Sequence, residues 1–442
     1  MGKSIRLKKG YDIKLTGEAQ KEILDAPASE IFAVKPTDFR SVTPKLQVKV
    51  GDEVMVGDAL FFDKQNEEIR FGSPVSGEVV EIVRGAKRRI LEIRILPDKT
   101  QKFSKVDIPS SIDAASVKET LLKANLWFLI RQRPFNITAN PADEPTGIFV
   151  SLFDTAPLAP DLGFVAEQNK EALHKGLEVL NALSGGKLYL GKPSDSDFSF
   201  SAAEVNSFSG PHPAGNVGIQ MHHTHPLKPG EKAWYLDLAD VITVGHLFTD
   251  GRFNPERIIA ITGSEVISPK YYKLKLGQSL KSLFSENVND RDVRLIQGNV
   301  LTGATSHNED FLSFFVSQLT AIPEGAHSEF LGWLLPSTSK LSLSRTFFSW
   351  LMPNKKYDLD TNLHGEERAF VVSGQYEKVL PMNIMPVQLL KAILAKDIER
   401  MEALGIHEIS EEDMALCEFV CTSKINVQEI VREGLDMMMA EG

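Results

Sequence analysis

Four histidines lie close together in one segment of the chain, FSGPHPAGNVGIQMHHTHP, residues 208–226. Neutral imidazoles are common metal ligands, so the first interpretation is a metal site that uses His223 and His225 on one face of a strand, or His222 with a distant partner. No cysteine or carboxylate stands nearby at ligand spacing, and no catalytic zinc helix motif occurs. We therefore favour the second interpretation, a rigid, turn-rich loop in which these side chains and His212 hydrogen-bond to the backbone, and we expect no metal here.

The cysteine content of the chain is limited to Cys417 and Cys421. Their spacing places them on one face of a predicted helix. An iron–sulfur cluster needs about four thiolates, so the chain cannot hold one by itself. A zinc site completed by His407 is an alternative that no other residue supports, and two buried structural thiols are the default interpretation. So few cysteines are also typical of a reducing compartment.

A nucleotide site would need a glycine-rich turn between a strand and a helix, where backbone N–H groups meet the phosphate. Neither GxGxxG nor GxxxxGK[ST] occurs in the chain. The loop after the apolar run at 147–153 reads DTAPLAPDLG, and its prolines and aspartates would withhold N–H groups and repel phosphate. A TGAT run at 302–305 is similar to a flavin-attachment motif but lacks the upstream Asp. We expect neither NADH nor flavin to bind this chain.

The charge of the chain argues against a nucleic-acid partner. It has 442 residues, with 49 basic against 59 acidic ones and a formal net charge of −10. An acidic chain without a basic block repels phosphate backbones. No apolar stretch approaches the roughly 20 residues of a membrane-spanning helix, and the N-terminus lacks the pattern of a signal peptide. The sequence therefore predicts a cytoplasmic protein, too long for a single hydrophobic core.

An alternation of apolar and polar residues predicts β-strands in the first part of the chain. Residues 46–62 alternate around two Gly-Asp turns, and residues 69–83 offer a second set of strands. Two such halves resemble the biotinyl/lipoyl-type barrel-sandwich. In that family a lysine at a hairpin tip carries the cofactor. Here Asn66 occupies that position and Lys64 lies two residues away, so we expect the fold without the swinging-arm function.

From about residue 115 the pattern changes to helical spacing and buried apolar runs. Strands and helices then alternate, which is typical of an open α/β sheet of Rossmann-like type. The elements are predicted at residues 116–130 (helix), 147–153 (strand), 165–184 (helix), 187–191 (strand), 234–248 (strand and helix) and 258–262 (strand). Short strands with many turns follow at 263–335, with a less regular helix at 309–319. The C-terminal helices are predicted at 386–405, 411–421 and 427–441.

Several longer stretches together resemble one family. Residues 126–161 are similar to the R-x-RPF … IFV-x-x-x-DT-x-PLA-x-D signature of the A subunit of the sodium-translocating NADH:quinone oxidoreductases (Na+-NQR). Other similar stretches are FSGPHPAG at 208–215, the DV-x-x-x-G-x-LF run at 240–248, QGNVLTG at 297–303 and EEDMALCEFVC at 411–421. They are spread along the whole chain, so the resemblance covers all of it.

The resemblance implies a multidomain protein of α/β and α+β class. Its expected parts are an N-terminal barrel-sandwich at 1–105, a Rossmann-like α/β domain at 106–262, a β-grasp (soluble-ligand-binding) domain with an adjoining β segment at 263–380, and a C-terminal helical bundle at 381–442. The related C subunit of the Rnf complex carries cysteine runs for iron–sulfur clusters in its C-terminal region. This chain has only two cysteines there, so we expect those clusters to be absent.

The resemblance also implies a function within a complex. Such complexes oxidise NADH, reduce ubiquinone or menaquinone, and export Na+, with FAD, FMN, riboflavin and a [2Fe–2S] centre held by other subunits. We expect this chain to have no cofactor and no catalytic residue of its own. It would bind the membrane subunits, chiefly the one with the quinone site, on the cytoplasmic side of the bacterial inner membrane, and support quinone reduction. A purely structural cap and an Rnf-type electron-transfer adaptor are the alternatives.

Any quinone contact is predicted in LWFLIRQRPF. A quinone ring needs an aromatic wall and a cationic donor for its carbonyl oxygens. The candidates are Trp127, Phe128, Arg131, Arg133 and Phe135. The competing interpretation places the aromatic residues in the core and pairs the arginines with acids.

A docking surface is predicted in SRTFFSWLMPNKK, residues 344–356. It places five large apolar side chains nearly in a row, between basic residues: Phe347, Phe348, Trp350, Leu351 and Met352. Exposed, such a run would mark an interface. The alternative is a buried strand in which Phe347 and Phe348 face opposite sides.

Overall fold

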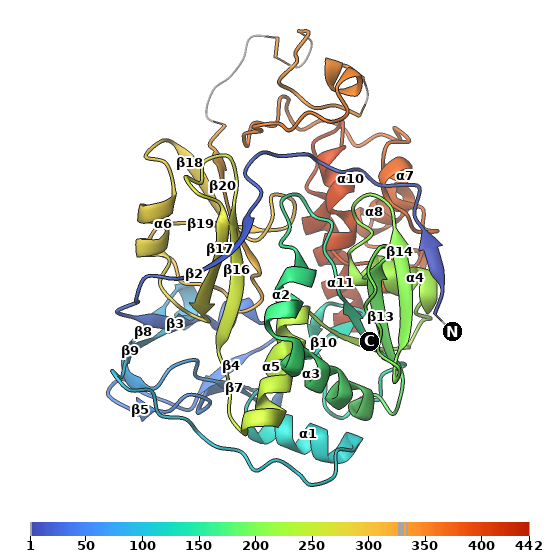
Figure 1. Cartoon of the computed structure of the whole chain (residues 1–442). Coiled ribbons are helices and arrows are strands. Elements are labelled where there is room, and N and C mark those ends of the chain that lie inside the picture. Colours follow the sequence, from blue (N-terminus) through green and yellow to red (C-terminus); the bar gives the residue numbers. More distant parts are fainter. Residues whose placement is uncertain (1, 326–330, 333–334, 344, 442) are drawn as a thin grey trace.

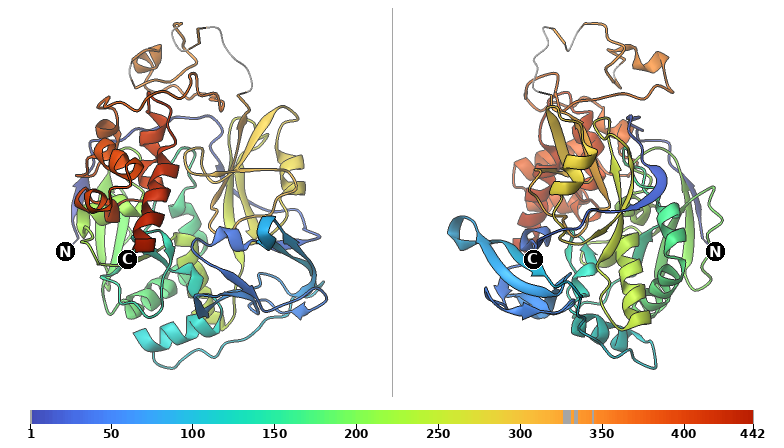
Figure 2. Two further views of the ribbon diagram at one scale, coloured as in Figure 1. Left: turned by 180° about the vertical axis from the view of Figure 1, so that it is seen from behind. Right: turned by 60° about the vertical axis from the view of Figure 1, so that its left-hand side comes forward.

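The computed structural model describes residues 2–325, 331–332, 335–343 and 345–441 (Figure 1). In these residues the strands form four β-sheets, with seven, six, four and three strands. The multidomain architecture expected from the sequence is confirmed. The C-terminal helices lie beside the seven-stranded sheet, and the two smaller sheets lie together near the six-stranded one (Figures 1 and 2).

The two small sheets form the barrel-sandwich. Their inward-facing residues, among them Leu60, Phe61, Phe71 and Ile93, are fully buried, as alternating strands that enclose a core require. Lys64 lies in the turn between β6 and β7, while Asn66 pairs with Asp63. The four-stranded sheet has the order β3 (Phe32–Val34), β9 (Ile90–Pro97), β8 (Gly77–Arg84) and β5 (Glu53–Val54), and the other consists of β4 (Pro44–Leu46), β6 (Ala59–Asp63) and β7 (Asn66–Gly72).

The seven-stranded sheet belongs to the Rossmann-like domain. Its order is β1-β14-β13-β12-β15-β10-β11. The first five of these strands run parallel, and β10 and β11 are antiparallel additions at one edge. The strands are β1 (Ser4–Arg6), β10 (Arg131–Arg133), β11 (Ile137–Thr138), β12 (Ile148–Ser151), β13 (Leu188–Pro193), β14 (Glu204–Ser209) and β15 (Ala233–Leu236).

Helices cover both faces of this sheet. On one face α3 (Lys170–Leu183) and α5 (Leu238–Asp250) approach backbone to backbone: a Cβ atom on Gly245 would lie 1.7 Å from the Ala172 carbonyl oxygen. On the other face α4 (Val217–Thr224) packs through Val217 and Met221 on β12 and β15. The sequential strands β12, β13 and β14 run outward in one direction and β15 lies on the other side of β12, so the strand order reverses between β12 and β15.

The six-stranded sheet forms the β-grasp part. Its order is β19-β18-β20-β16-β17-β2, and α6 (Lys281–Asn287) packs on it through the buried side chains of Leu283 and Phe284. The strands are β2 (Gln20–Asp25), β16 (Glu256–Thr262), β17 (Lys270–Lys275), β18 (Val293–Gln297), β19 (Ala304–Ser306) and β20 (Gln318–Pro323).

The C-terminal helices form a separate apolar core with residues that include Leu389, Ile393, Leu416 and Leu435. None of the helices in the described residues combines the length and the apolar composition that a membrane span requires. The helices of this part are α7 (Tyr376–Val379), α8 (Pro386–Leu394), α9 (Ile398–Ala403), η6 (Glu412–Met414), α10 (Ala415–Phe419) and α11 (Val427–Glu441).

Three strands lie in sheets other than those expected. The run at 258–262 was expected to continue the Rossmann-like sheet, but it is β16 of the six-stranded sheet. A short apolar run fits the buried centre of any sheet, so its pattern does not say which sheet it joins. The first 25 residues were likewise expected in the barrel-sandwich but are not part of it. Strand β1 belongs to the seven-stranded sheet and β2 to the six-stranded one.

Helix bounds also differ from the expectations. The helix expected at 165–184 is divided at Asn169 into α2 (Leu162–Gln168) and α3, and the one expected at 386–405 is divided into α8 and α9. The helix expected at 116–130 is shorter: α1 (Ala114–Lys123) ends at Lys123, and a 3-10 turn, η3 (Trp127–Leu129), follows. No α-helix forms at 309–319, where β20 begins.

Candidate functional site

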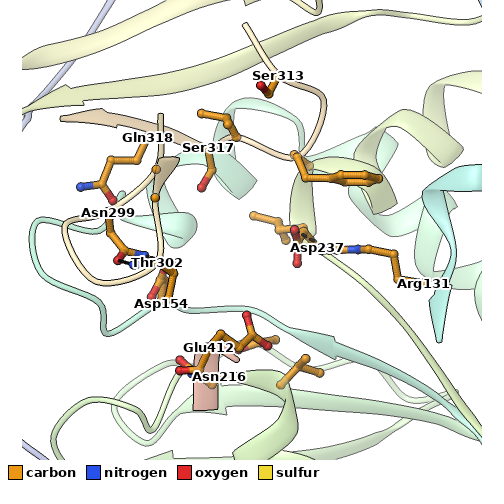
Figure 3. Close-up of a pocket in the computed structure, with 18 of the residues that line it drawn as sticks. Arg131, Asp154, Asn216, Asp237, Asn299, Thr302, Ser313, Ser317, Gln318 and Glu412 are labelled. Atoms are coloured by element: carbon orange, nitrogen blue, oxygen red, sulfur yellow. Dashed lines mark hydrogen bonds and ion pairs between the residues drawn. The ribbon is translucent and has the colours of Figure 1, made fainter. Parts of the chain in front are cut away.

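A cavity of about 480 Å³ opens where the strand order of the Rossmann-like sheet reverses (Figure 3). Ser151 ends β12 and Leu236 ends β15, and both residues line the cavity. In open α/β sheets, loops that leave neighbouring strands in opposite directions create such a crevice at the carboxyl ends. This is therefore the place in the fold where a ligand is expected.

Polar residues at helix N-termini form the floor of the cavity. Asp154 follows β12, Asp237 is the N-cap of α5, and Asn216 is the N-cap of α4. Burial raises the pKa of Asp154, although its carboxylate accepts a hydrogen bond from the Ala156 N–H at 2.8 Å. In a dinucleotide site the pyrophosphate would lie against such N-termini. Here the Asp237 carboxylate lies at one such N-terminus and that of Asp154 lies in the loop after β12, and both disfavour a phosphate.

The opposite wall comes from the six-stranded sheet. The loop after β18 contributes Asn299 and Thr302, and the segment before β20 contributes Ser313 and Ser317. Asn299 shapes its loop because its Oδ1 accepts hydrogen bonds from the N–H groups of residue 301 and Thr302, at 2.8 and 3.0 Å. Figure 3 shows this wall facing Asn216 and Glu412 across the cavity.

Arg131 is one of three arginines that line the cavity, with Arg40 and Arg257. Its guanidinium lies over two rings, 4.5 Å from the centre of Tyr235 and 4.7 Å from that of Phe315. One of its terminal nitrogens pairs with Asp237 at 2.5 Å, and its Nε makes no hydrogen bond to any described residue. Burial alone would lower the pKa of Arg131, but Asp237 and the other nearby acids raise it. Arg131 therefore stays charged beside two aromatic rings.

Glu412 is a protonatable acid on the same cavity. Burial raises the pKa of Glu412 to about 7, with Asp413 adding to the effect and Arg133 opposing it. The carboxylate pairs with Arg133 at 2.5 Å, and 39% of its side-chain surface remains accessible. A carboxyl group of this kind can donate a hydrogen bond when protonated and accept one when ionised.

Only Arg131 among the five predicted contact residues lines the cavity. Trp127 and Phe128 are fully buried. The Trp127 indole N–H donates to the Ala139 carbonyl at 2.7 Å, and Phe128 packs on Phe39, among other rings. Neither side chain has surface that a ligand could touch, so the prediction that Trp127 and Phe128 contact a quinone is corrected. The run LWFLI belongs to the hydrophobic core between the domains.

Arg133 and Phe135 also make contacts that hold the fold together and do not line the cavity. Arg133 is 2% exposed and pairs with Asp413 at 3.0 Å as well as with Glu412. It thereby joins β10 to the C-terminal helices. Phe135 packs against the C-terminal core, and its carbonyl accepts a hydrogen bond from Arg432 at 2.7 Å. The competing interpretation, that the aromatic residues are core and the arginines are paired, describes this segment better.

Sequence reasoning on single motifs missed the cavity, but the stretches that carry the family resemblance surround it. Four of the five contribute lining residues, and only the 240–248 stretch does not. Examples are Asp154 from DTAPLAPD, Gly215 from FSGPHPAG, Asn299 from QGNVLTG and Glu412 from EEDMALCEFVC. Their convergence on one place is the signal that could have located the site.

The four histidines lie outside the cavity, and His222 and His223 tie α4 to the C-terminal part of the chain. His222 Nδ1 lies 2.7 Å from a Glu408 carboxylate oxygen, and its Nε2 accepts a hydrogen bond from the Asn383 N–H. His223 Nε2 lies 2.7 Å from the Pro381 carbonyl oxygen. Burial lowers the pKa of His212 to about 4. Residues 217–224 form a helix and not the expected loop, but the hydrogen bonds agree with the structural interpretation.

The two cysteines belong to the C-terminal core. Both are buried, and burial raises the pKa of the Cys417 thiol. A thiol in such surroundings is a poor nucleophile and a poor metal ligand. Across the residues that the structure describes, no group of three or more His, Cys, Asp or Glu side chains is placed to hold a metal ion.

Family profiles match three consecutive parts of the chain. The profile of the NqrA N-terminal barrel-sandwich hybrid domain matches residues 5–98, that of the NqrA second alpha/beta domain matches residues 112–253, and that of the NQRA C-terminal domain matches residues 258–308. The second and third meet between α5 and β16, where the structure changes from the seven-stranded to the six-stranded sheet.

Curated relatives match the chain from end to end. The A subunit of the Na(+)-translocating NADH-quinone reductase of Shewanella denitrificans is 36% identical over 99% of this chain and 100% of its own length. The protein of the same name from Alcanivorax borkumensis is 35% identical, with the same coverage of both chains.

Among solved structures, an NAD+-reducing [NiFe]-hydrogenase in the air-oxidized state is similar over 75% of this chain and 62% of its own. The identity is 11% and the TM-score 0.40, from which neither fold nor function follows. The family profiles and the full-length relatives decide the assignment: this chain belongs to the family formed by the A subunits of the Na(+)-translocating NADH-quinone reductases.

Proposed function

We propose that this chain supports the quinone-reduction end of the reductase. The quinone head group would contact it in the cavity where the strand order of the Rossmann-like sheet reverses. The observation that carries the proposal is Arg131, a largely buried cation held beside two aromatic rings at the wall of the cavity. An uncharged ring with carbonyl oxygens matches this wall, and negative charge that develops on those oxygens during reduction would be stabilised by the guanidinium.

The size and lining of the cavity support this ligand class. Its volume of about 480 Å³ lies within the roughly 300–1,000 Å³ that small-molecule sites usually have. Apolar side chains, including Phe153, Leu162 and Phe315, line it beside the polar groups. The carboxylates of Asp154 and Asp237 disfavour a phosphate, so the cavity suits a quinone better than a nucleotide.

Residues of this chain would bind and orient the ring. The Arg131 guanidinium would donate to one carbonyl oxygen. Glu412, whose pKa is raised to about 7 by burial, lies on the same cavity and would donate a hydrogen bond in its protonated form. Reduction of the quinone to the quinol takes two electrons and two protons, and the electrons would come from the cofactors of other subunits. The chain itself would carry none.

The proposal also places the chain on the cytoplasmic side of the bacterial inner membrane, bound to the membrane subunits. A purely structural cap is the second candidate, and the exposed apolar residues at 348–351 favour such docking. Docking and quinone binding do not exclude each other. The third interpretation, an Rnf-type adaptor, would need more thiolates than Cys417 and Cys421 supply.

The experiment blocks the cavity without touching its charged network. Thr302 is exposed and lines the cavity, so Thr302→Trp should fill it and weaken binding of a short-tailed ubiquinone to the isolated chain by tenfold or more. Thr305→Trp is the matched control, because Thr305 is exposed three residues away and does not line the cavity. If both variants bind the quinone as the unmodified chain does, the cavity is not the site and the structural cap is favoured.

A further inference from the structure

An apolar lobe projects from the body of the molecule near the C-terminal helices. It consists of residues 335–343 and 345–356, part of the orange segment that stands away from the sheets in both figures (Figures 1 and 2). Phe348, Trp350 and Leu351 are 43%, 51% and 58% exposed. Large apolar side chains that stay this exposed side by side mark an interaction surface.

The local conformation explains this exposure. Residues Phe348–Leu351 form a 3-10 helix, η4, and not the buried strand that was the alternative prediction. Phe347, just before it, is buried and anchors the lobe. A tight turn after that anchor directs Trp350 and Leu351 outward. Of the expected apolar run, Phe347 thus belongs to the lobe's interior, and Ser344 lies outside the described residues.

The charge of the lobe is opposite to that of the chain. Between residues 335 and 356 the sequence has four basic residues and no acidic one, whereas the whole chain has a net charge of −10. The Arg345 guanidinium lies 5.5 Å from the centre of the Trp350 ring. Lys355 donates to the Thr338 carbonyl at 2.7 Å, and Lys356 pairs with Glu18 at 2.9 Å. Of the basic residues, Arg345 thus lies directly beside the exposed Trp350 ring, and the two lysines follow a few residues later in the lobe.

We propose that the apolar lobe binds the anionic surface of a lipid bilayer. A tryptophan beside arginine and lysine is the usual composition of a segment that inserts at the headgroup level, because the ring is amphipathic and the cations meet the phosphates. A protein interface core is instead depleted of lysine. Trp350 and Leu351 would enter the headgroup region, with Arg345 and Lys355 at its outer edge. This contact goes beyond the proposed function, since it requires neither quinone nor another protein chain.

The test is flotation of the isolated full-length chain with lipid vesicles. Vesicles of phosphatidylcholine mixed with phosphatidylglycerol should carry the chain upward, phosphatidylcholine alone should carry tenfold less, and raised salt should release it. The double variant Trp350→Ala, Leu351→Ala and the double variant Lys355→Gln, Lys356→Gln should each bind at least tenfold less. Leu394→Ala is the matched control, because Leu394 is similarly exposed, at 53%, on α8.

Three outcomes would overturn the proposal. They are no binding to the anionic vesicles, equal binding to both kinds of vesicle, and equal binding by the lobe variants and the control. If the chain ignores vesicles but binds the detergent-purified membrane subunits through Trp350, the lobe is a protein-docking surface. Circular dichroism of each variant shows that it remains folded. None of these results depends on quinone binding, so this proposal and the proposed function fail separately.

Discussion

Two arginines of one motif have different roles because their partners differ. Arg131 and Arg133 are alternate residues of β10 and share one face of the strand, and both guanidinium groups lie over the Tyr235 ring. Arg131 pairs with Asp237 at the cavity, whereas Arg133 pairs with Asp413 and Glu412 from the C-terminal helices. The spacing of the two residues predicts a shared face but says nothing of partners far away in the sequence.

Arg133→Ala is expected to destabilise the chain. The side chains of Arg133 and Asp413 are 2% and 0% exposed, so the substitution would leave a buried carboxylate without its cation. Breaking such a pair costs about 3–5 kcal/mol of unfolding free energy. The measurement is urea denaturation beside Arg294→Ala, whose part-exposed pair with Glu324 should contribute only about 1 kcal/mol or less. Equal losses in the two variants would contradict the account.

Glu412 should give the chain a pH-dependent stability. Burial raises its pKa from 4.5 to about 7 in the folded state. Between these values the folded chain keeps a proton that the unfolded chain has lost. The stabilising contribution is therefore complete below pH 4.5 and is lost as the pH rises through 7. Glu412→Gln cannot titrate, so its melting temperature relative to that of the unmodified chain should be higher at about pH 8 than at about pH 5. A difference that does not change with pH would show that Glu412 is ionised in the folded state.

Among the elements, α5 both packs closely against α3 and carries a residue of the cavity. Its N-terminus carries Asp237 and its buried acid Asp240 pairs with Arg257 at 2.5 Å. Further along, Gly245 lets the helix approach α3, because any Cβ there would meet the Ala172 carbonyl. The position of Asp237 at the cavity therefore depends on a close contact between two helices.

Gly245→Val should displace α5 and lower the thermal stability of the chain. The added side chain would meet backbone atoms at 1.7 Å, which only a shift of the helix can relieve. Overpacking of this kind typically costs about 1–3 kcal/mol, and more where backbone must move. Gly365→Val is the control, since the nearest atom to a Cβ there is the Lys424 Cε at 3.8 Å. The two melting temperatures, measured by calorimetry, should differ; if they agree, the contact between α3 and α5 is looser than the structure has it.

Elements were more predictable from the sequence than their places in the fold. The strands at 147–153 and 187–191 and the helix α5 follow directly from apolar runs and helical spacing. Asn169 and Lys396 divide two predicted helices, because a non-helical turn there breaks an otherwise continuous apolar face. The assignment of β16 to its sheet could not be predicted, because strand pairing between distant segments is decided by the packing of whole domains.

At the scale of the whole molecule, the cavity forms where several parts of the folded chain meet. Its lining comes from residues 38–40 of the barrel-sandwich, the Rossmann-like domain, the six-stranded sheet and the C-terminal helices. The N-terminal segment adds a strand to two different sheets and so ties the parts together. No single motif could predict such a site, and the family-like stretches indicate it only once the fold brings them to one place.

The most direct test of the central claim is a calorimetric titration of the isolated, unmodified chain. Three ligands are compared in the same buffer: a short-tailed ubiquinone, FMN and NADH. The acidic helix N-termini and the ring-stacked Arg131 predict saturable binding of the quinone and no binding of either phosphate-bearing ligand. Tight binding of FMN or NADH, or the absence of any quinone binding, would contradict the account.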